Sequence, residues 1–215
     1  MNEEVLAAIE KYKIIAIVRG VESSKCMKVA EALYAGGIKL MEITYNQSAP
    51  ESWETTAKAI GDIAEAFQGR MFAGAGTVTS TKLVELTAAA GGRYIISPNT
   101  NTDVIRKTKE LGLISIPGAM TPSEILTAHE AGADFVKLFP ASDLGISYLK
   151  AIRAPISHVK LLATGGINEG NARAFLDAGA CGLGIGGGLA NKKAIEAGEF
   201  EKLTEAAKAF VAAIS

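Results

Sequence analysis

The stretch MFAGAGTVTSTKLVELTAAAGGRYIIS, residues 71–97, contains one complete unit of the fold. A short apolar run at 71–76 comes first, a segment with helical periodicity follows at 80–92, and a second β-type run ends the stretch at 93–97. A helix start signal, TSTK, and a helix stop signal, AGG, flank the middle segment. Because two strands joined by a helical crossover pair in parallel, the stretch predicts a βαβ unit.

The same alternation of β-type runs and helical segments extends from this stretch toward both ends of the chain. Glycine stop signals recur after the helical segments as AG or LG pairs. The segment after the sixth run is weaker, because ISYLKAIRAP at 146–155 predicts only a short helix. The predicted strands are eight runs, at 13–19, 38–44, 71–76, 93–97, 113–117, 134–139, 159–164 and 181–186.

Eight βα units close into a barrel, so the predicted fold class is α/β, a (β/α)₈ TIM barrel that forms one domain over residues 1–215. An open, doubly wound sheet is the alternative. That fold is expected to show a GxGxxG turn near the N-terminus, and the sequence has none there. The first twelve residues are amphipathic and predict an extra N-terminal helix that caps the bottom of the barrel.

Composition and charge argue against several classes of partner. The chain has 22 basic and 23 acidic residues, and this balance offers no basic field for nucleic acid or an anionic membrane. No apolar run reaches the ~18 residues that a membrane span needs, and the acidic start is not a secretory signal. Cys26 and Cys181 lie far apart without CxxC spacing, which favours reduced thiols in a cytoplasmic protein.

Metal catalysis is not expected from the histidines. His129 falls inside a predicted helix, and His158 falls before the seventh predicted strand, at the bottom of the barrel. Neither position is at the end of the barrel where the chemistry collects, and no cluster has ligand spacing. We therefore predict no metal site.

A lysine and a glutamate stand inside strands that otherwise read as buried. Side chains alternate along a strand, which turns Lys137 in DFVKLFP (134–140) and Glu42 in MEIT (41–44) toward the barrel interior. Desolvation disfavours the ammonium form, so the pKa of Lys137 should fall and its amine could attack a ketone to form an imine. Glu42 could then transfer protons. The alternative is a buried Lys137–Glu42 ion pair that only holds the barrel, although such pairs contribute little stability.

Two glycine turns follow the last two predicted strands, TGGI at 164–167 and GIGGGL at 184–189. In phosphate-binding barrels, the loops after strands seven and eight hold the anion through backbone N–H groups. Glycine lets that backbone approach closely. The turns therefore indicate a small phosphorylated ligand, and tight turns without a ligand are the alternative.

In their order and spacing, six segments resemble the class I aldolases of 2-keto-3-deoxy-6-phosphogluconate (KDPG) and 4-hydroxy-2-oxoglutarate (KHG). The resemblance covers nearly the whole chain and implies a (β/α)₈ barrel, no cofactor and a homotrimer. The matching segments are MEIT (41–44), GAGTV (74–78), ISP (96–98), IPGAMTPSE (116–124), VKLFPA (136–141) and TGGI (164–167).

The resemblance also implies roles for individual residues. Lys137 would form the Schiff base, and Glu42 would move protons through a bound water or a substrate hydroxyl. Thr77, Pro98 and Phe139 would line the pyruvate end of the site, and the two glycine turns would surround the phosphate. The substrate-binding candidates are Arg19, Thr77, Pro98, Phe139, Thr164, Gly165, Gly166, Gly186 and Gly187.

Two positions depart from the family pattern. Well-known members carry an arginine four residues after the catalytic glutamate, where it grips the pyruvate carboxylate, and this chain has Asn46 there. Our hypothesis is that Arg19 replaces it, since a guanidinium suits bidentate carboxylate binding. Some members also have a serine in the last glycine turn. GGG at 186–188 lacks that hydroxyl, so phosphate binding would rest on backbone donors.

The expected function is cleavage of KDPG to pyruvate and glyceraldehyde 3-phosphate, of KHG to pyruvate and glyoxylate, or of both. The stretches RG (19–20) and SPNT (97–100) also resemble the branch that cleaves the galactonate epimer, 2-keto-3-deoxy-6-phosphogalactonate (KDPGal). Two further hypotheses stay open. One is a sugar-phosphate epimerase or isomerase that uses Lys137 and Glu42 as acid and base, and the other is a non-catalytic barrel that binds a sugar phosphate.

Overall fold

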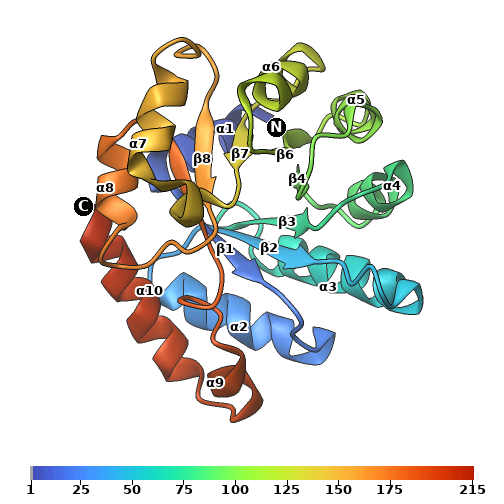
Figure 1. The fold of residues 1–215 in the computed structure, drawn as a ribbon. Coiled ribbons are helices and arrows are strands. Elements are labelled where there is room, and N and C mark those ends of the chain that lie inside the picture. The colour runs from blue at the N-terminus through green and yellow to red at the C-terminus, as the bar shows by residue number, and fades with distance from the viewer. Residues whose placement is uncertain (1) are drawn as a thin grey trace.

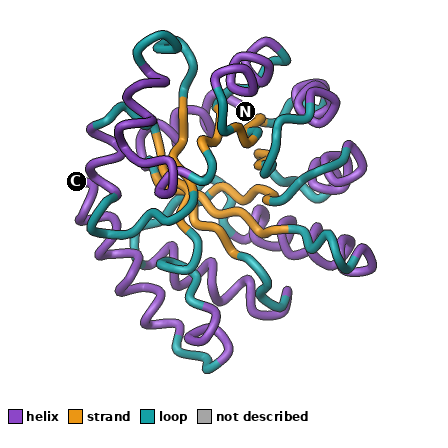
Figure 2. Tube along the Cα trace, viewed as in Figure 1, coloured by secondary structure: helices purple, strands orange, loops and turns teal. Residues whose placement is uncertain are grey.

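The computed structural model describes residues 2–215, with the strands at the centre and the helices around them (Figures 1 and 2). The strands are β1 (Ile14–Val18), β2 (Leu40–Thr44), β3 (Phe72–Gly76), β4 (Tyr94–Ile96), β5 (Ile114–Ile116), β6 (Gly118–Ala119), β7 (Val136–Leu138), β8 (Leu161–Thr164) and β9 (Gly182–Ile185). The helices are α1 (Asn2–Tyr12), α2 (Ser23–Ala35), the 3₁₀ turn η1 (Pro50–Ser52), α3 (Trp53–Ala66), α4 (Thr81–Ala89), α5 (Thr102–Glu110), α6 (Pro122–Glu130), α7 (Ala141–Arg153), α8 (Ala172–Asp177), α9 (Lys192–Glu196) and α10 (Phe200–Ile214).

The sheet has nine strands in the order β5-β4-β3-β2-β1-β9-β8-β7-β6. All the pairings between neighbouring strands are parallel. The two strands at the ends of this order, β5 and β6, follow one another directly in the chain, so the sheet closes on itself. The predicted barrel is confirmed, and below we call its two ends the carboxyl end and the amino end, after the strand termini that lie there.

One predicted strand needs a correction. The run at 113–117 was expected to be a single fifth strand, but Pro117 separates β5 from β6. Proline has no backbone N–H and cannot donate to a strand ladder. Its carbonyl still accepts from Lys137 N at 2.8 Å. The split strand therefore pairs with β4 on one side and with β7 on the other.

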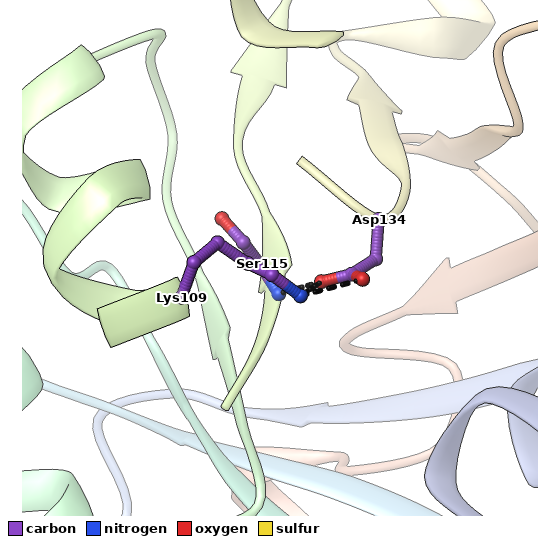
Figure 3. Close-up of polar contacts among 3 residues, drawn as sticks. All are labelled: Lys109, Ser115 and Asp134. Atoms are coloured by element: carbon purple, nitrogen blue, oxygen red, sulfur yellow. Dashed lines mark hydrogen bonds and ion pairs between the residues drawn. The ribbon is translucent and has the colours of Figure 1, made fainter. Parts of the chain in front are cut away.

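A carboxylate helps to close the barrel between β5 and β7 at the amino end. Asp134 accepts hydrogen bonds from Lys109 Nζ at 2.7 Å and from Ser115 N at 2.8 Å (Figure 3). In return, Ser115 O accepts from Asp134 N at 3.0 Å. Asp134 thus ties α5, β5 and the start of β7 together.

Helix α1 covers the amino end, as the sequence predicted; Met1 lies outside the described residues. Its buried side chains Val5 and Ile9 belong to a cluster with interior residues of the strands, including Tyr94 and Leu162. This apolar cluster closes the amino end of the barrel interior, so a ligand can enter only at the carboxyl end. Among residues 2–215, no helix is both long enough and apolar enough to cross a membrane.

The prediction of only a short helix at 146–155 was incomplete. Helix α7 begins at Ala141, and Gly145 interrupts it with a φ of +84°. The predicted segment corresponds to the part after this glycine. The turn before it escaped prediction because Pro140 and Gly145 break the helical pattern at both of its ends.

Candidate active site

Glu42 and Lys137 face each other across the barrel interior. They come from β2 and β7, which the strand order places on opposite sides of the ring. Only 1% of Glu42 and 5% of Lys137 are exposed. Both line a small internal cavity together with Ile96, Leu162 and Thr164. The predicted inward orientation of both side chains is therefore confirmed.

Burial changes the protonation of both groups. Burial raises the pKa of Glu42 from 4.5 to about 7, although the positive charges of Lys137 and Arg19 act in the opposite direction. Burial lowers the pKa of Lys137; Glu42 opposes this shift in pKa, and Arg19 adds to it. A carboxyl group that titrates near neutral pH can act as an acid and as a base, and a lysine with a lowered pKa supplies more free amine.

Space for the Glu42 carboxylate depends on Gly76 of β3. A Cβ added at this glycine would lie 2.5 Å from Glu42 Oε1, so any other residue there would displace the carboxylate. Glu42 Oε2 is buried and has no hydrogen-bond partner among residues 2–215. Since buried polar atoms are nearly always paired, an unpaired carboxylate oxygen facing a cavity is the kind of group that meets a ligand or a water.

Thr77, directly after β3, is strained. Its φ of +56° lies in the left-handed region, which a β-branched side chain seldom adopts. Such a conformation costs about 1–3 kcal/mol and is found where the surrounding structure enforces it, often at functional sites. The Thr77 hydroxyl is also buried without a hydrogen-bond partner among the described residues. Thr77 and Glu42 therefore share one sign of a binding site, a buried oxygen without a partner among residues 2–215, and Thr77 adds backbone strain.

A cleft of about 940 Å³ opens at the carboxyl end, above the internal cavity. The two share Lys137 and Thr164, so a ligand in the cleft reaches the buried amine. Lys137 Nζ lies 4.7 Å from the centre of the Phe139 ring. The cleft brings together every substrate-binding candidate from the sequence: Arg19, Thr77, Pro98, Phe139, Thr164, Gly165, Gly166, Gly186 and Gly187.

One end of the cleft is formed by the two glycine turns. Gly166 has a φ of +70°, and a Cβ there would clash with Ser142 Cβ, so the turn requires glycine. Lys192 and Lys193, at the start of α9, line the same end. These two lysines were not predicted from the sequence, although the KK pair follows the last glycine turn by only three residues. Backbone donors are thus accompanied by two cationic side chains.

Asn46, at the position of the family arginine, is engaged in its own loop. Its side-chain oxygen accepts from Ser48 N at 3.0 Å, and its carbonyl accepts from the Trp53 indole at 2.9 Å. Asn46 is not among the residues that line the cleft, whereas Arg19 is. The structure therefore places Arg19, and not Asn46, in the cleft.

Comparisons with known proteins agree with this geometry. The family described as KDPG and KHG aldolase matches residues 5–206. The chain is 35% identical to 2-dehydro-3-deoxy-6-phosphogalactonate aldolase of Escherichia coli, over 94% of this chain and 95% of the relative. It is 38% identical to a probable aldolase of the same name from Rhizobium meliloti, over 82% of this chain and 81% of the relative.

A solved structure extends the similarity to three dimensions. KDPG aldolase from Legionella pneumophila, with pyruvate captured at low pH as a covalent carbinolamine intermediate, superposes with a TM-score of 0.85. The two chains are 29% identical, and the match covers 95% of this chain and 97% of the other. The family resemblance inferred from the sequence is confirmed, and the chain belongs to the KDPG and KHG aldolase family.

Proposed function

We propose that the protein is a class I aldolase that cleaves a phosphorylated 2-keto-3-deoxy sugar acid to pyruvate and glyceraldehyde 3-phosphate. One observation carries the proposal: a buried lysine with a lowered pKa faces a buried glutamate with a raised pKa, beneath an open cleft. A purely structural ion pair would account for neither the unpaired Glu42 oxygen nor the cleft that reaches Lys137.

The reaction starts with attack of the neutral Lys137 amine on the C2 ketone of the substrate. The carbinolamine that forms loses water, with Glu42 moving the protons, and becomes a protonated imine. Glu42 then takes the proton of the C4 hydroxyl. As the C3–C4 bond breaks, its electron pair moves toward the imine nitrogen, the C4 fragment leaves as an aldehyde, and an enamine remains. Protonation at C3 by Glu42 and hydrolysis of the imine release pyruvate and restore the amine.

Binding of the pyruvate half falls to Arg19, Thr77, Pro98 and Phe139. Arg19 is proposed to hold the carboxylate, because it is the arginine that lines the cleft and the family arginine is absent at Asn46. Arg19→Ala should raise KM for the aldol substrate and the half-saturating concentration of pyruvate. An unchanged KM in Arg19→Ala would remove this role from Arg19.

Phosphate is proposed to lie between the glycine turns, with Gly165, Gly166, Gly186 and Gly187 as backbone donors and the two lysines of α9 nearby. Both relatives described above are named for the galactonate epimer, so KDPGal is the first substrate to test. KDPG and KHG follow, because the family includes enzymes for both.

We also propose that the protein is a homotrimer, from the family resemblance. A cytoplasmic location is proposed from the unbridged Cys26 and Cys181.

The test is pyruvate release by the purified protein from KDPGal, KDPG and KHG, followed by the oxidation of NADH in a coupled lactate dehydrogenase assay. We expect release from at least one phosphorylated epimer, and slower release from KHG. Exchange of a substrate proton with deuterium from the solvent, without pyruvate release from any substrate, would contradict the proposal and favour an epimerase.

A further inference from the structure

Gln47 joins the two loops that follow β2 and β3. Its Nε2 donates to Thr77 O at 2.8 Å, and its Oε1 accepts from Thr79 Oγ1 at 2.8 Å. Because the donor and the acceptor of the amide are both used, the orientation of the side chain is fixed. Gln47 lies five residues after Glu42, so the segment that carries the proposed acid/base group also reaches the loop after β3.

The loop after β3 needs such a contact at Thr77. Backbone hydrogen bonds hold the residues on either side, from Tyr45 N to Gly76 O at 2.9 Å and from Val78 N to Ile96 O at 3.1 Å. Thr77 itself has a φ of +56°, which its branched side chain disfavours. Gln47 bonds to the carbonyl of this strained residue and therefore restrains the peptide that sets the direction of its side chain.

We infer that Gln47 is a positioning residue: it holds Thr77 in the orientation that presents the Thr77 hydroxyl to the pyruvate half of the substrate. The inference rests on the proposed aldolase function. Gln47 is exposed at the rim and is not among the residues that line the cleft, so it acts through Thr77 and not on the substrate. The pairing of Gln47 with Thr79 makes the arrangement a three-residue clamp, formed by Gln47, Thr77 and Thr79.

The test compares Gln47→Leu and Gln47→Glu with the wild-type protein. Leu removes both hydrogen bonds, whereas an ionised Glu can still accept from Thr79 but cannot donate to Thr77 O. Gln68→Leu is the matched control, because Gln68 is an exposed glutamine in the turn between α3 and β3, at the amino end. The measurements are kcat and KM for cleavage, the half-saturating pyruvate concentration in borohydride trapping, and the thermal midpoint.

We expect both Gln47 variants to raise KM and the half-saturating pyruvate concentration by about 3- to 10-fold, with kcat within about twofold of wild type. A merely structural loss would lower the active fraction, and hence kcat, without moving KM. Thr79→Val removes only the hydroxyl that holds Gln47 Oε1, and should give a smaller rise in KM. This variant keeps the inference testable if a Gln47 variant folds poorly.

A double-mutant cycle with Thr77→Gly tests whether Gln47 affects pyruvate binding through Thr77. Glycine adopts a positive φ without strain and has no hydroxyl to present. In the Thr77→Gly background, Gln47→Leu should therefore change pyruvate half-saturation by less than about twofold. The inference is overturned if Gln47→Leu behaves like Gln68→Leu, or if its effect is the same size with and without Thr77. Failure of the wild-type protein to trap pyruvate would instead overturn the proposed function.

Discussion

The polar groups at the two ends of the barrel differ in whether they have hydrogen-bond partners. At the amino end, Asp134 is satisfied by Lys109 and Ser115 (Figure 3). Helix α1 seals the interior there with apolar side chains. At the carboxyl end, Glu42 and Thr77 each keep a buried oxygen without a partner among residues 2–215. The difference indicates that one end is built for stability and that the other holds groups ready for a substrate.

Lys137 gives the most direct test of the difference between the two ends. Lys137→Met should reduce cleavage by roughly 10⁴-fold or more, because the nucleophile is lost. The free energy of unfolding should change little below about pH 7, where Glu42 is protonated, and should fall above it, since the variant leaves the buried carboxylate without its opposite charge. The measurements are single-turnover cleavage and urea unfolding. Lys160→Met, at a half-exposed lysine that pairs with Glu10, is the matched control and should cleave normally. Normal cleavage by Lys137→Met would contradict the proposed Schiff-base mechanism.

Glu42→Gln tests the second group at the carboxyl end. The loss of the proton-transferring carboxyl should lower kcat by about 10²- to 10⁴-fold. In the wild-type protein the carboxylate acts as the base, so the rate of C–C cleavage should rise as the pH passes through about 7, the pKa of Glu42. Rapid-quench cleavage across this pH range measures the profile. A rise of the same size in Glu42→Gln would show that another group titrates.

Glu42→Gln should also change how the free energy of unfolding depends on pH. Burial raises the pKa of Glu42 from 4.5 to about 7, so the folded state binds this proton more tightly than the unfolded state. The contribution of protonated Glu42 to the free energy of unfolding is therefore fully present below pH 4.5. It decreases by roughly 3 kcal/mol as the pH rises to about 7. Denaturant unfolding at several pH values should show this decline in the wild-type protein and a flatter profile in Glu42→Gln.

At the amino end, Asp134→Asn should reduce stability and leave cleavage nearly unchanged. The variant weakens charge-assisted hydrogen bonds to Lys109 and Ser115, which should cost about 1–3 kcal/mol of unfolding free energy. Cleavage per folded molecule should change little. Asp62→Asn is the matched control, because Asp62 pairs with Lys58 at 2.6 Å on an exposed helix face and should cost under about 1 kcal/mol. Equal losses in the two variants would remove the special role of Asp134.

The smallest effect is expected at Lys193. Lys193→Gln removes an exposed charge from the phosphate end of the cleft and should raise KM for a phosphorylated substrate by about two- to fivefold. Added salt should reduce the difference from wild type. KM for unphosphorylated KHG should not change. Equal shifts for both kinds of substrate would show that Lys193 acts on the cleft as a whole.

The sequence predicted the barrel and the inward faces of Glu42 and Lys137, because strand alternation and parallel crossovers leave few other arrangements. It did not predict the contact of Gln47 with Thr77 or the approach of α9 to the cleft. The contact of Gln47 with Thr77 joins residues 30 positions apart, and no period in the sequence reports it. The lysines of α9 follow the last glycine turn closely, so only the glycine pattern, and not the KK pair, entered the prediction. The positive φ of Thr77 could not be predicted either, because a threonine gives no local signal for a left-handed backbone.

Imine formation at Lys137 is the step on which the proposed function depends. The direct test is borohydride reduction of the protein incubated with pyruvate, followed by intact mass measurement and peptide mapping. We expect one reduced pyruvate adduct per chain, on the peptide that contains Lys137, and none in Lys137→Met. A folded protein that shows no adduct would contradict the claim; Lys137 would then be a proton-transfer or structural residue.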